Sequence, residues 1–188
     1  TFEQASMAYA YGAKSMTHVY NGMTPYNHRN NGLVGAAFRL NGIYGEIICD
    51  GNHSTPVALH EYFKAKGPDY AVMVTDALMA KGSPAGSKFI FGGNEIEIYE
   101  DGSAHLTSTK GLAGSTLKMN NGLRILIEEA LVPVATAINS CTRNPANCIG
   151  LGDVKGSIKV GYDADLVVLD SEYNVLQTYV LGNEMING

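Results

Sequence analysis

The sequence predicts an α/β fold that contains the C-terminal part of a (β/α)8 TIM-like barrel together with a small β-sandwich domain. Three short, largely apolar segments end in polar side chains. Segment 14–18 ends at His18, segment 43–49 is followed by the polar residues 50–53, and segment 70–75 is followed by Asp76. Parallel strands buried on both faces are continuous apolar runs, and barrel enzymes carry reactive groups where such strands end. Because the spacing between the runs fits one βα unit each, we expect the polar groups to share one rim.

The length of the chain limits this interpretation. A closed eight-stranded barrel takes about 250 residues and rarely fewer than about 200, whereas this chain has 188 residues and uses its last third for other structure. The strands could form a smaller open sheet, or the chain could be the C-terminal part of a longer protein. We favour the second interpretation and expect the N-terminal part of the barrel to lie outside this chain.

The composition is that of an ordinary globular protein. No apolar stretch approaches the roughly 20 residues that span a bilayer. The 13 Lys and Arg against 18 Asp and Glu give a net charge of -5 without a basic run, so neither a membrane nor nucleic acid is an expected partner. The three cysteines are an odd number without metal-type spacing, which argues against a disulfide framework. We therefore expect a cytoplasmic protein.

Local signals divide residues 1–82 into alternating helices and strands, which we assign to the barrel. Helices are expected over 2–11 and 56–66, the second because residues 54–56 (Ser-Thr-Pro) provide a cap and a proline for the first turn. Residues 20–35 are rich in Asn and Gly and predict a loop too long for a simple turn, hence a functional one.

Later residues show two further patterns. Short strands separated by turns are expected over 88–91, 95–99 and 103–106, and again from 156 to 181. Helices are expected over 115–130, 134–141 and 144–149. We therefore assign residues 110–152 to the barrel as well, and residues 83–109 and 153–188 to one small β-sandwich domain.

Five motifs together resemble those of the N-acetylglucosamine-6-phosphate deacetylase family, in the same order and spacing. They are THVYNGM at 17–23, HR at 28–29 with GLVG at 32–35, DGNH at 50–53, VTDA at 74–77 and LAGS at 112–115. A segment at 155–166 also resembles the closing motif of the amidohydrolase superfamily. The resemblance covers essentially the whole chain. It implies a metal-dependent barrel that hydrolyses the acetamide of N-acetylglucosamine 6-phosphate, in amino-sugar catabolism.

The resemblance also implies a divalent metal, Zn²⁺ or Fe²⁺, held by a glutamate and two histidines. Only the second histidine, matching His18, lies in this chain, and the other ligands are expected outside it. One imidazole is fewer than the three protein ligands that catalytic metal sites usually use. We therefore expect the chain by itself to be inactive or incomplete as a catalyst.

Asp76 is the expected catalytic residue, because a carboxylate beside the attacking water can take its proton and return it to the departing amine. The resemblance places His53 among the substrate contacts, on the sugar or on the carbonyl oxygen. Arg29 offers a planar, permanently charged donor for the phosphate, with His28 as a second donor. In the resembling enzymes this arginine reaches the site of the neighbouring subunit, so we expect a homodimer.

The resemblance implies five further substrate contacts. Asn21 and Gly22 follow the strand that carries the metal ligand. Leu112, Ala113 and Gly114 are expected at the start of a helix, where free backbone amides suit an anion.

Two other functions stay open. An amidohydrolase that opens a ring, of the dihydroorotase or imidazolonepropionase type, would share the closing motif and the strand-end aspartate, but its cyclic amide has no phosphate for Arg29 to bind. A non-catalytic interaction module would instead use the exposed sheet edge and apolar surface of an incomplete barrel. Activity measured with and without the upstream segment separates these alternatives.

Overall fold

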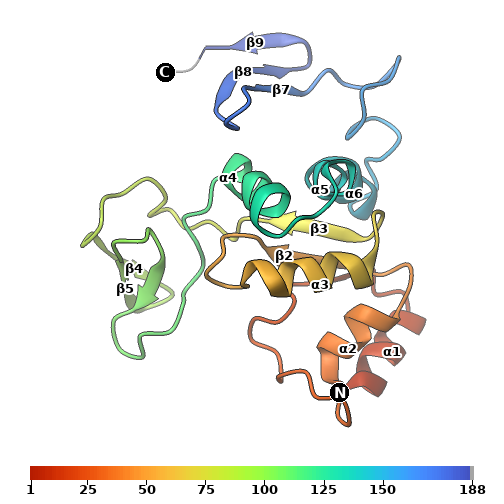
Figure 1. The fold of residues 1–188 in the computed structure, drawn as a ribbon, viewed down its shortest axis with the longest axis vertical. Helices are drawn as coiled ribbons and strands as arrows, with labels where there is room; N and C mark the ends of the chain where they lie inside the picture. The colour runs from red at the N-terminus through yellow and green to blue at the C-terminus, as the bar shows by residue number, and fades with distance from the viewer. Residues whose placement is uncertain (187–188) are drawn as a thin grey trace.

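Three parallel strands form the centre of the computed structural model, which describes residues 1–186 (Figure 1). They are β1 (Ser15–Met16), β2 (Tyr44–Ile48) and β3 (Ala71–Val74), hydrogen bonded in chain order. Met16 lies opposite Gly45, and Ile48 lies opposite Val74. Consecutive parallel strands joined through helices are βα units, so the α/β class and the three expected strands are confirmed.

Helices connect and cover this sheet. They are α1 (Phe2–Ala10) before β1, α2 (Gly32–Arg39) before β2, α3 (Pro56–Lys66) before β3, and later α4 (Met119–Arg124), α5 (Val134–Cys141) and α6 (Arg143–Cys148). In Figure 1, α4, α5 and α6 lie above the strands and α1 and α2 lie below them. α1 packs on α2, α2 packs on α3, and α5 and α6 pack on β3. Neighbouring helices therefore follow one another in chain order.

The α3 helix begins and ends where the sequence predicts. The Thr55 side chain accepts a hydrogen bond from the Ala58 amide at 3.3 Å, and Pro56 occupies the first turn, where its missing amide costs nothing. Gly67 ends the helix. Cap chemistry is local, which explains why the sequence was sufficient here.

The expected loop over 20–35 is wrong at its end, because α2 begins at Gly32. Two glycines in this helix suggested a loop, since glycine is unfavourable in helix interiors. Ala36 and Ala37 are buried in the main core, and Val34 is buried as well. Burial of these small side chains outweighs the low helix propensity.

The expected helix over 115–130 is also shorter and less regular than predicted. Its α-helical part begins only at Met119, and residues Ile125–Glu129 form a π-helical turn. The Ala130 amide closes this turn by donating to the Ile125 carbonyl at 2.8 Å. The Ala130 carbonyl in turn lies 2.8 Å from Nδ1 of His60 on α3. A tertiary contact therefore accompanies the irregular turn.

The main core lies between the parallel sheet and its helices. Its large, fully buried members include Val19, Ile43, Ile47, Leu59, Tyr62, Met73 and Leu126. The Tyr62 hydroxyl donates to the Gly45 carbonyl of β2 at 2.8 Å. A Cβ on Gly45 would lie 2.0 Å from that hydroxyl oxygen, so only glycine permits the approach. α3 is thus fixed on the sheet by apolar contact and by a buried hydrogen bond.

Two antiparallel sheets flank this centre. One contains β4 (Lys88–Phe91), β5 (Asn94–Ile98) and β6 (Ala104–Leu106), and the other contains β7 (Leu166–Leu169), β8 (Val175–Val180) and β9 (Asn183–Met185). The strands from β4 to β8 lie in the expected regions, whereas β9 lies beyond the expected end at residue 181. Among residues 1–186 the two sheets share no strand pairing, and Figure 1 shows them on different sides of the molecule. The assignment of both to one β-sandwich stays a prediction.

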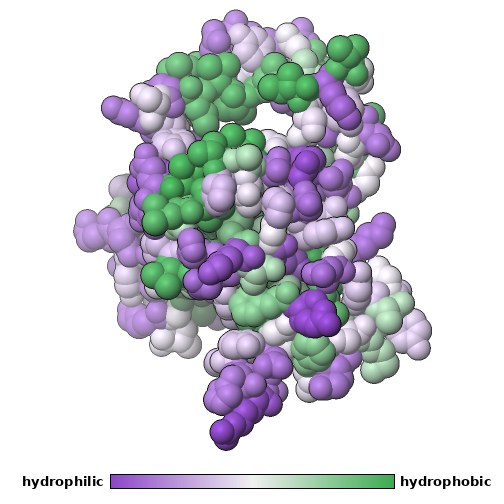
Figure 2. All heavy atoms as spheres, turned by 45° about the vertical axis from the view of Figure 1, so that its right-hand side comes forward, coloured by the Kyte–Doolittle hydropathy of each residue, from purple (hydrophilic) through white to green (hydrophobic). Residues whose placement is uncertain are grey.

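The two flanking sheets differ in burial. The β4–β6 sheet has a small core of its own, made by Ile96, Ile98 and Ala104 with Leu78. The β7–β9 sheet instead exposes apolar side chains, among them Val167 (58%) and Leu176 (54%). Figure 2 shows these strands as green areas at the top of the molecule.

The buried ammonium group of Lys66 joins the end of α3 to the end of α2. Nζ donates to the carbonyls of Ala37 (3.0 Å) and Leu40 (3.3 Å), which the last turn of α2 leaves without an intrahelical donor. The residue is 8% exposed, and burial lowers the pKa of its amine from 10.5 to about 8. Lys66 therefore acts as a buried cap for α2.

We expect Lys66→Met to lower the free energy of unfolding by about 1–3 kcal/mol, because two carbonyls lose their donor. Lys64→Met, on the exposed side of the same helix, is the control and should have little effect. Since the folded protein releases the Lys66 proton at lower pH than the unfolded chain, the stability of wild type relative to Lys66→Met should rise between pH 8 and 10.5. Urea denaturation across this range measures both effects, and equal stability of the two proteins throughout would contradict the capping role.

Candidate active site

The carboxyl ends of the three parallel strands present polar side chains along one edge of the sheet. His18 lies just after β1, Asp50 and His53 follow β2, and Asp76 lies just after β3. Neighbouring parallel strands end at the same edge, so the connections that follow them are also neighbours. The structure therefore places these four residues at the same edge of the sheet, as the sequence predicts for His18, His53 and Asp76.

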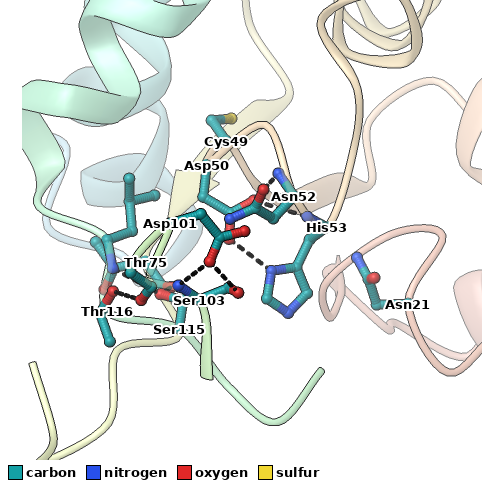
Figure 3. Close-up of polar contacts among 12 residues, drawn as sticks. Asn21, Cys49, Asp50, Asn52, His53, Thr75, Asp101, Ser103, Ser115 and Thr116 are labelled. Carbon is teal, nitrogen blue, oxygen red and sulfur yellow. Dashed lines mark hydrogen bonds and ion pairs between the residues drawn. The ribbon is translucent and has the colours of Figure 1, made fainter. Parts of the chain in front are cut away.

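His53 and Asp50 form a buried polar pair on this rim (Figure 3). Nδ1 of His53 lies 2.6 Å from Oδ2 of Asp50, and the two side chains are 6% and 11% exposed. Partial burial raises the pKa of the Asp50 carboxyl, but hydrogen bonds from the ring and amide of His53 and from the amide of Asn52 outweigh it. The net pKa is below the ordinary value of 3.8. Asp50 is therefore ionised at neutral pH.

A polar cavity of about 160 Å³ lies beside this pair. Its opposite wall includes Asp101 and Ser103, from the turn between β5 and β6, and the segment that leads into α4. The Ser103 amide (2.9 Å) and hydroxyl (2.5 Å) both donate to Oδ1 of Asp101 (Figure 3). The β4–β6 sheet thus contributes a wall of the candidate site.

His18 faces a second, larger cavity of about 350 Å³, which Asn21 and Gly22 also line. Small and apolar side chains such as Ala5, Ala8 and Ile43 form much of the remaining wall. Nδ1 of His18 is buried and has no hydrogen-bond partner in the described part of the chain. A buried imidazole nitrogen without a hydrogen-bond partner fits a metal ligand.

The residues fit one ligand of a metal site and not a complete site. Residues 1–186 contain no group of three or more His, Cys, Asp or Glu side chains that could hold an ion. Catalytic zinc sites usually use three protein ligands and a water. Any further ligands would have to come from outside these residues, as the sequence predicts.

Asp76 lies in a connection that is held by the segment before α4. The Ser115 amide donates to the Asp76 carbonyl at 2.7 Å, and the Ser115 hydroxyl donates to the Thr75 carbonyl (Figure 3). The Leu78 amide completes the link by donating to the Ser115 carbonyl at 2.8 Å. The Asp76 side chain is exposed and lines neither of the two cavities.

His18 and Asp76 share an unusual backbone conformation. Their φ angles are 32° and 49°, in the left-handed region. Residues other than glycine pay about 1–3 kcal/mol there, and such residues cluster at functional sites. Tyr20, Lys110 and Leu131 also have positive φ, so this conformation is compatible with a site role for His18 and Asp76 but does not single them out.

His28 and Arg29 lie at the tip of a tight turn. Asn27 and Asn30 exchange backbone hydrogen bonds of 3.3 and 3.1 Å, and Oδ1 of Asn27 accepts from the Arg29 amide at 2.9 Å. Both side chains are exposed and line neither cavity. The structure does not bring them together with His53 inside one chain.

Leu112, Ala113 and Gly114 do not begin a helix, so that part of the prediction is wrong. They extend the β4–β6 sheet: the Ala113 amide donates to the Ala104 carbonyl at 3.0 Å, and α4 begins only at Met119. These residues therefore provide no helix N-terminus for an anion, while their expected contact with the substrate stays a prediction. Gly114 still lines the 160 Å³ cavity.

Sequence reasoning missed two carboxylates of the site. Asp50 lies three positions before His53, with Gly51 and Asn52 between them, and this spacing is typical of an Asx turn that could have identified the pair. Asp101 precedes a glycine in a hairpin turn, and no local signal distinguishes it from other turn residues.

Comparisons with known proteins agree with this geometry. Residues 4–185 match the model of the Amidohydrolase family. The chain belongs to the amidohydrolase family. The N-acetylglucosamine-6-phosphate deacetylase of Bacillus subtilis (strain 168) is 41% identical over 172 residues, which cover 92% of this amidohydrolase chain and 43% of the relative. The N-acetylgalactosamine-6-phosphate deacetylase of Escherichia coli O157:H7 is 36% identical over 182 residues, which cover 97% of this chain and 47% of the relative.

A solved structure shows the same likeness. The crystal structure of N-acetylglucosamine-6-phosphate deacetylase from Pasteurella multocida matches with a TM-score of 0.92 at 32% identity, over 100% of this chain and 48% of that one. The amidohydrolase chain thus spans about half the length of the relatives it matches. Members of the family are generally metal-dependent, which agrees with a free imidazole nitrogen on the rim.

Gly114 fixes the distance between the segment before α4 and the connection that carries Asp76. Its φ is +57°, and a Cβ there would lie 2.8 Å from the Leu78 side chain and 3.1 Å from the Asp76 carbonyl oxygen. We expect Gly114→Ala to lower the free energy of unfolding by about 1–3 kcal/mol. Gly111→Ala is the control, because its Cβ would meet only the Thr109 hydroxyl, at 3.4 Å. Urea denaturation measures both, and a neutral Gly114→Ala would show that the segment moves freely away from Asp76.

Proposed function

We propose that the protein is a metal-dependent deacetylase that converts N-acetylglucosamine 6-phosphate to glucosamine 6-phosphate and acetate, in amino-sugar catabolism. The observation that carries this proposal is the succession of His18, the Asp50–His53 pair and Asp76 on adjacent parallel strands, in a chain 41% identical to the Bacillus subtilis deacetylase. Because the chain covers 43% of that relative, we propose that its strands belong to a (β/α)8 barrel with an added β-sandwich, completed by further sequence.

Hydrolysis of an acetamide needs a strong nucleophile, a polarised carbonyl and a proton for the departing amine. A divalent ion such as Zn²⁺ or Fe²⁺, with His18 as one ligand, supplies the first two when bound. Asp76 would take the proton of the attacking water and deliver it to the amine. His53, supported by Asp50, would contact the sugar or the carbonyl oxygen.

Phosphate recognition would involve a second copy of the protein. Arg29 and His28 are exposed at a turn tip outside both cavities, which supports a role in the site of a partner. A guanidinium binds phosphate through two parallel hydrogen bonds, so a homodimer would complete each site. Asn21, Gly22 and residues 112–114 would contact the substrate from its own subunit.

N-acetylgalactosamine 6-phosphate is a second candidate substrate, because an Escherichia coli O157:H7 relative of that name is 36% identical to this chain. The two sugars differ in configuration at C4 and share the acetamide and the phosphate. The roles proposed for Asp76 and Arg29 are therefore the same for both.

A sugar phosphate substrate suggests where the protein acts. Among the described residues, no helix has the length and apolar character needed to cross a membrane. Sugar phosphates are made and retained inside cells, so we propose a cytoplasmic location.

Turnover of both sugar phosphates by wild type and by Asp76→Asn tests the proposed function. We expect wild type, expressed with its upstream sequence and supplied with metal, to release amine and acetate. Asp76→Asn should lower kcat by about 10²–10⁴-fold, because the proton carrier is lost, while sugar-phosphate binding is retained. An unchanged kcat would exclude the proton transfer role.

The same assay distinguishes the alternatives. Unphosphorylated N-acetylglucosamine and dihydroorotate serve as comparison substrates. Ring opening without amine release would favour the ring-opening hydrolases. No turnover of any substrate, with or without the upstream sequence, would favour an interaction module.

Arg29→Ala should mainly raise KM, by about tenfold or more, because a charge-assisted hydrogen bond to the phosphate contributes about 1.5–3 kcal/mol to binding. The control is Arg39→Ala, an exposed arginine at the end of α2. Mixing Arg29→Ala with Asp76→Asn subunits tests the route of the contact. Each hybrid dimer has one site with an intact Asp76 and the partner's Arg29, so activity should return. No recovery would mean that Arg29 acts within its own subunit.

A further inference from the structure

The Asp50 carboxylate is held on both of its oxygens. Oδ1 accepts hydrogen bonds from the backbone amides of Asn52 (2.9 Å) and His53 (2.8 Å), while Oδ2 lies 2.6 Å from Nδ1 of the His53 ring. Two amides of a short loop therefore fix the orientation of the carboxylate. The position of Oδ2, and with it the direction of its contact with the His53 ring, is therefore set by this loop.

This arrangement determines which ring nitrogen carries the proton. An ionised carboxylate has only acceptor oxygens, so the Nδ1 atom that faces it must be the donor. A neutral imidazole has one N–H, and when that proton is on Nδ1 the other nitrogen, Nε2, carries a free lone pair. Among residues 1–186 no group hydrogen-bonds Nε2, and the ring projects away from Asp50 beside the polar cavity (Figure 3).

Within residues 1–186 no group of the opposite wall hydrogen-bonds the His53 ring. Oδ1 of Asp101 accepts from the amide and hydroxyl of Ser103, and the Ser103 hydroxyl also lies 2.8 Å from Nε2 of His105. Asp50 is therefore the ring's hydrogen-bond partner in this part of the chain. The tautomer of His53 therefore depends on Asp50.

We propose that Asp50 is a positioning residue, which holds His53 with a proton on Nδ1 so that Nε2 is the ring nitrogen that meets the substrate. The part of this inference that concerns substrate rests on the proposed deacetylase function. Both contacts considered for His53 use this nitrogen: with one proton on the ring Nε2 accepts from a sugar hydroxyl, and with two protons it donates to the carbonyl oxygen.

Asp50→Asn inverts the hydrogen bonding at the ring without changing the size of the side chain. The amide oxygen is needed by the two backbone N–H groups, so the NH₂ group turns toward Nδ1. The ring must then accept on Nδ1 and carry its proton on Nε2. Asp69→Asn is the matched control, because it makes the same chemical change at an exposed carboxylate. Asp69 pairs with Arg143 and lies just before β3, at the end of the strand opposite to the candidate site.

Nitrogen-15 NMR of the histidine rings measures the tautomer directly, at the alkaline end of the titration, where the ring is neutral. The His53 signals are assigned by comparison with His53→Gln. We expect Nδ1 to be protonated in wild type and in Asp69→Asn, and Nε2 to be protonated in Asp50→Asn. A wild-type ring with its proton on Nε2 overturns the proposal, and this result requires no variant to fold.

Kinetics of the metal-supplied enzyme with its upstream sequence provide the second readout. We expect Asp50→Asn to lower kcat/KM by about 100-fold or more, as a wrong tautomer does in other enzymes, and Asp69→Asn to leave it unchanged. An inverted tautomer with unchanged kcat/KM overturns the role of Asp50 in the reaction. Absence of deacetylation in wild type, together with the expected wild-type tautomer, would instead contradict the proposed function, so the two failures are distinguishable.

Discussion

Parallel pairing of three short strands is the constraint on which the rest of the structure depends. β2 and β3 pair from Gly45 opposite Ala71 to Ile48 opposite Val74, and β1 adds on the other side of β2. Since the strands run in the same direction, every connection that follows a strand lies at one edge of the sheet. His18, the Asp50–His53 pair and Asp76 lie at this edge, whereas Lys66 caps α2 near the opposite edge.

The geometry of the rim comes from the backbone as much as from side chains. Asp50 is fixed by loop amides, and the Asp76 connection is fixed by the backbone of Ser115. His18 and Asp76 have left-handed backbone angles, which persist only where surrounding contacts offset their cost. The segment before α4 supplies part of that support, so the β4–β6 sheet and the rim form one structural unit.

The C-terminal sheet has a different relation to the rest of the chain. Its strands are regular, with β8 paired to both β7 and β9, yet apolar side chains on them are exposed. A sheet of three strands gains stability when one of its faces is covered. The β4–β6 sheet has such cover in its own small core, and it lies beside the candidate site.

The sequence by itself determined the elements whose signals are local. The apolar runs of β2 and β3, the cap and first-turn proline of α3 and the turns of β4–β6 depend on residues that are neighbours in the chain, and the structure confirms them. The ordered motifs also predicted His18 and Asp76 as site residues, and these follow β1 and β3 at the same edge of the sheet. Such features could be predicted because each needs only a few consecutive residues.

Only the tertiary structure decided the features that depend on distant contacts. α2 forms despite its glycines because its small side chains are buried, and Leu112 and Ala113 are not helical because they pair with β6. The wall formed by Asp101 and the free Nε2 of His53 likewise exist only once the loops meet. Burial and pairing across the chain outweigh local propensity, and no consecutive stretch of sequence contains that information.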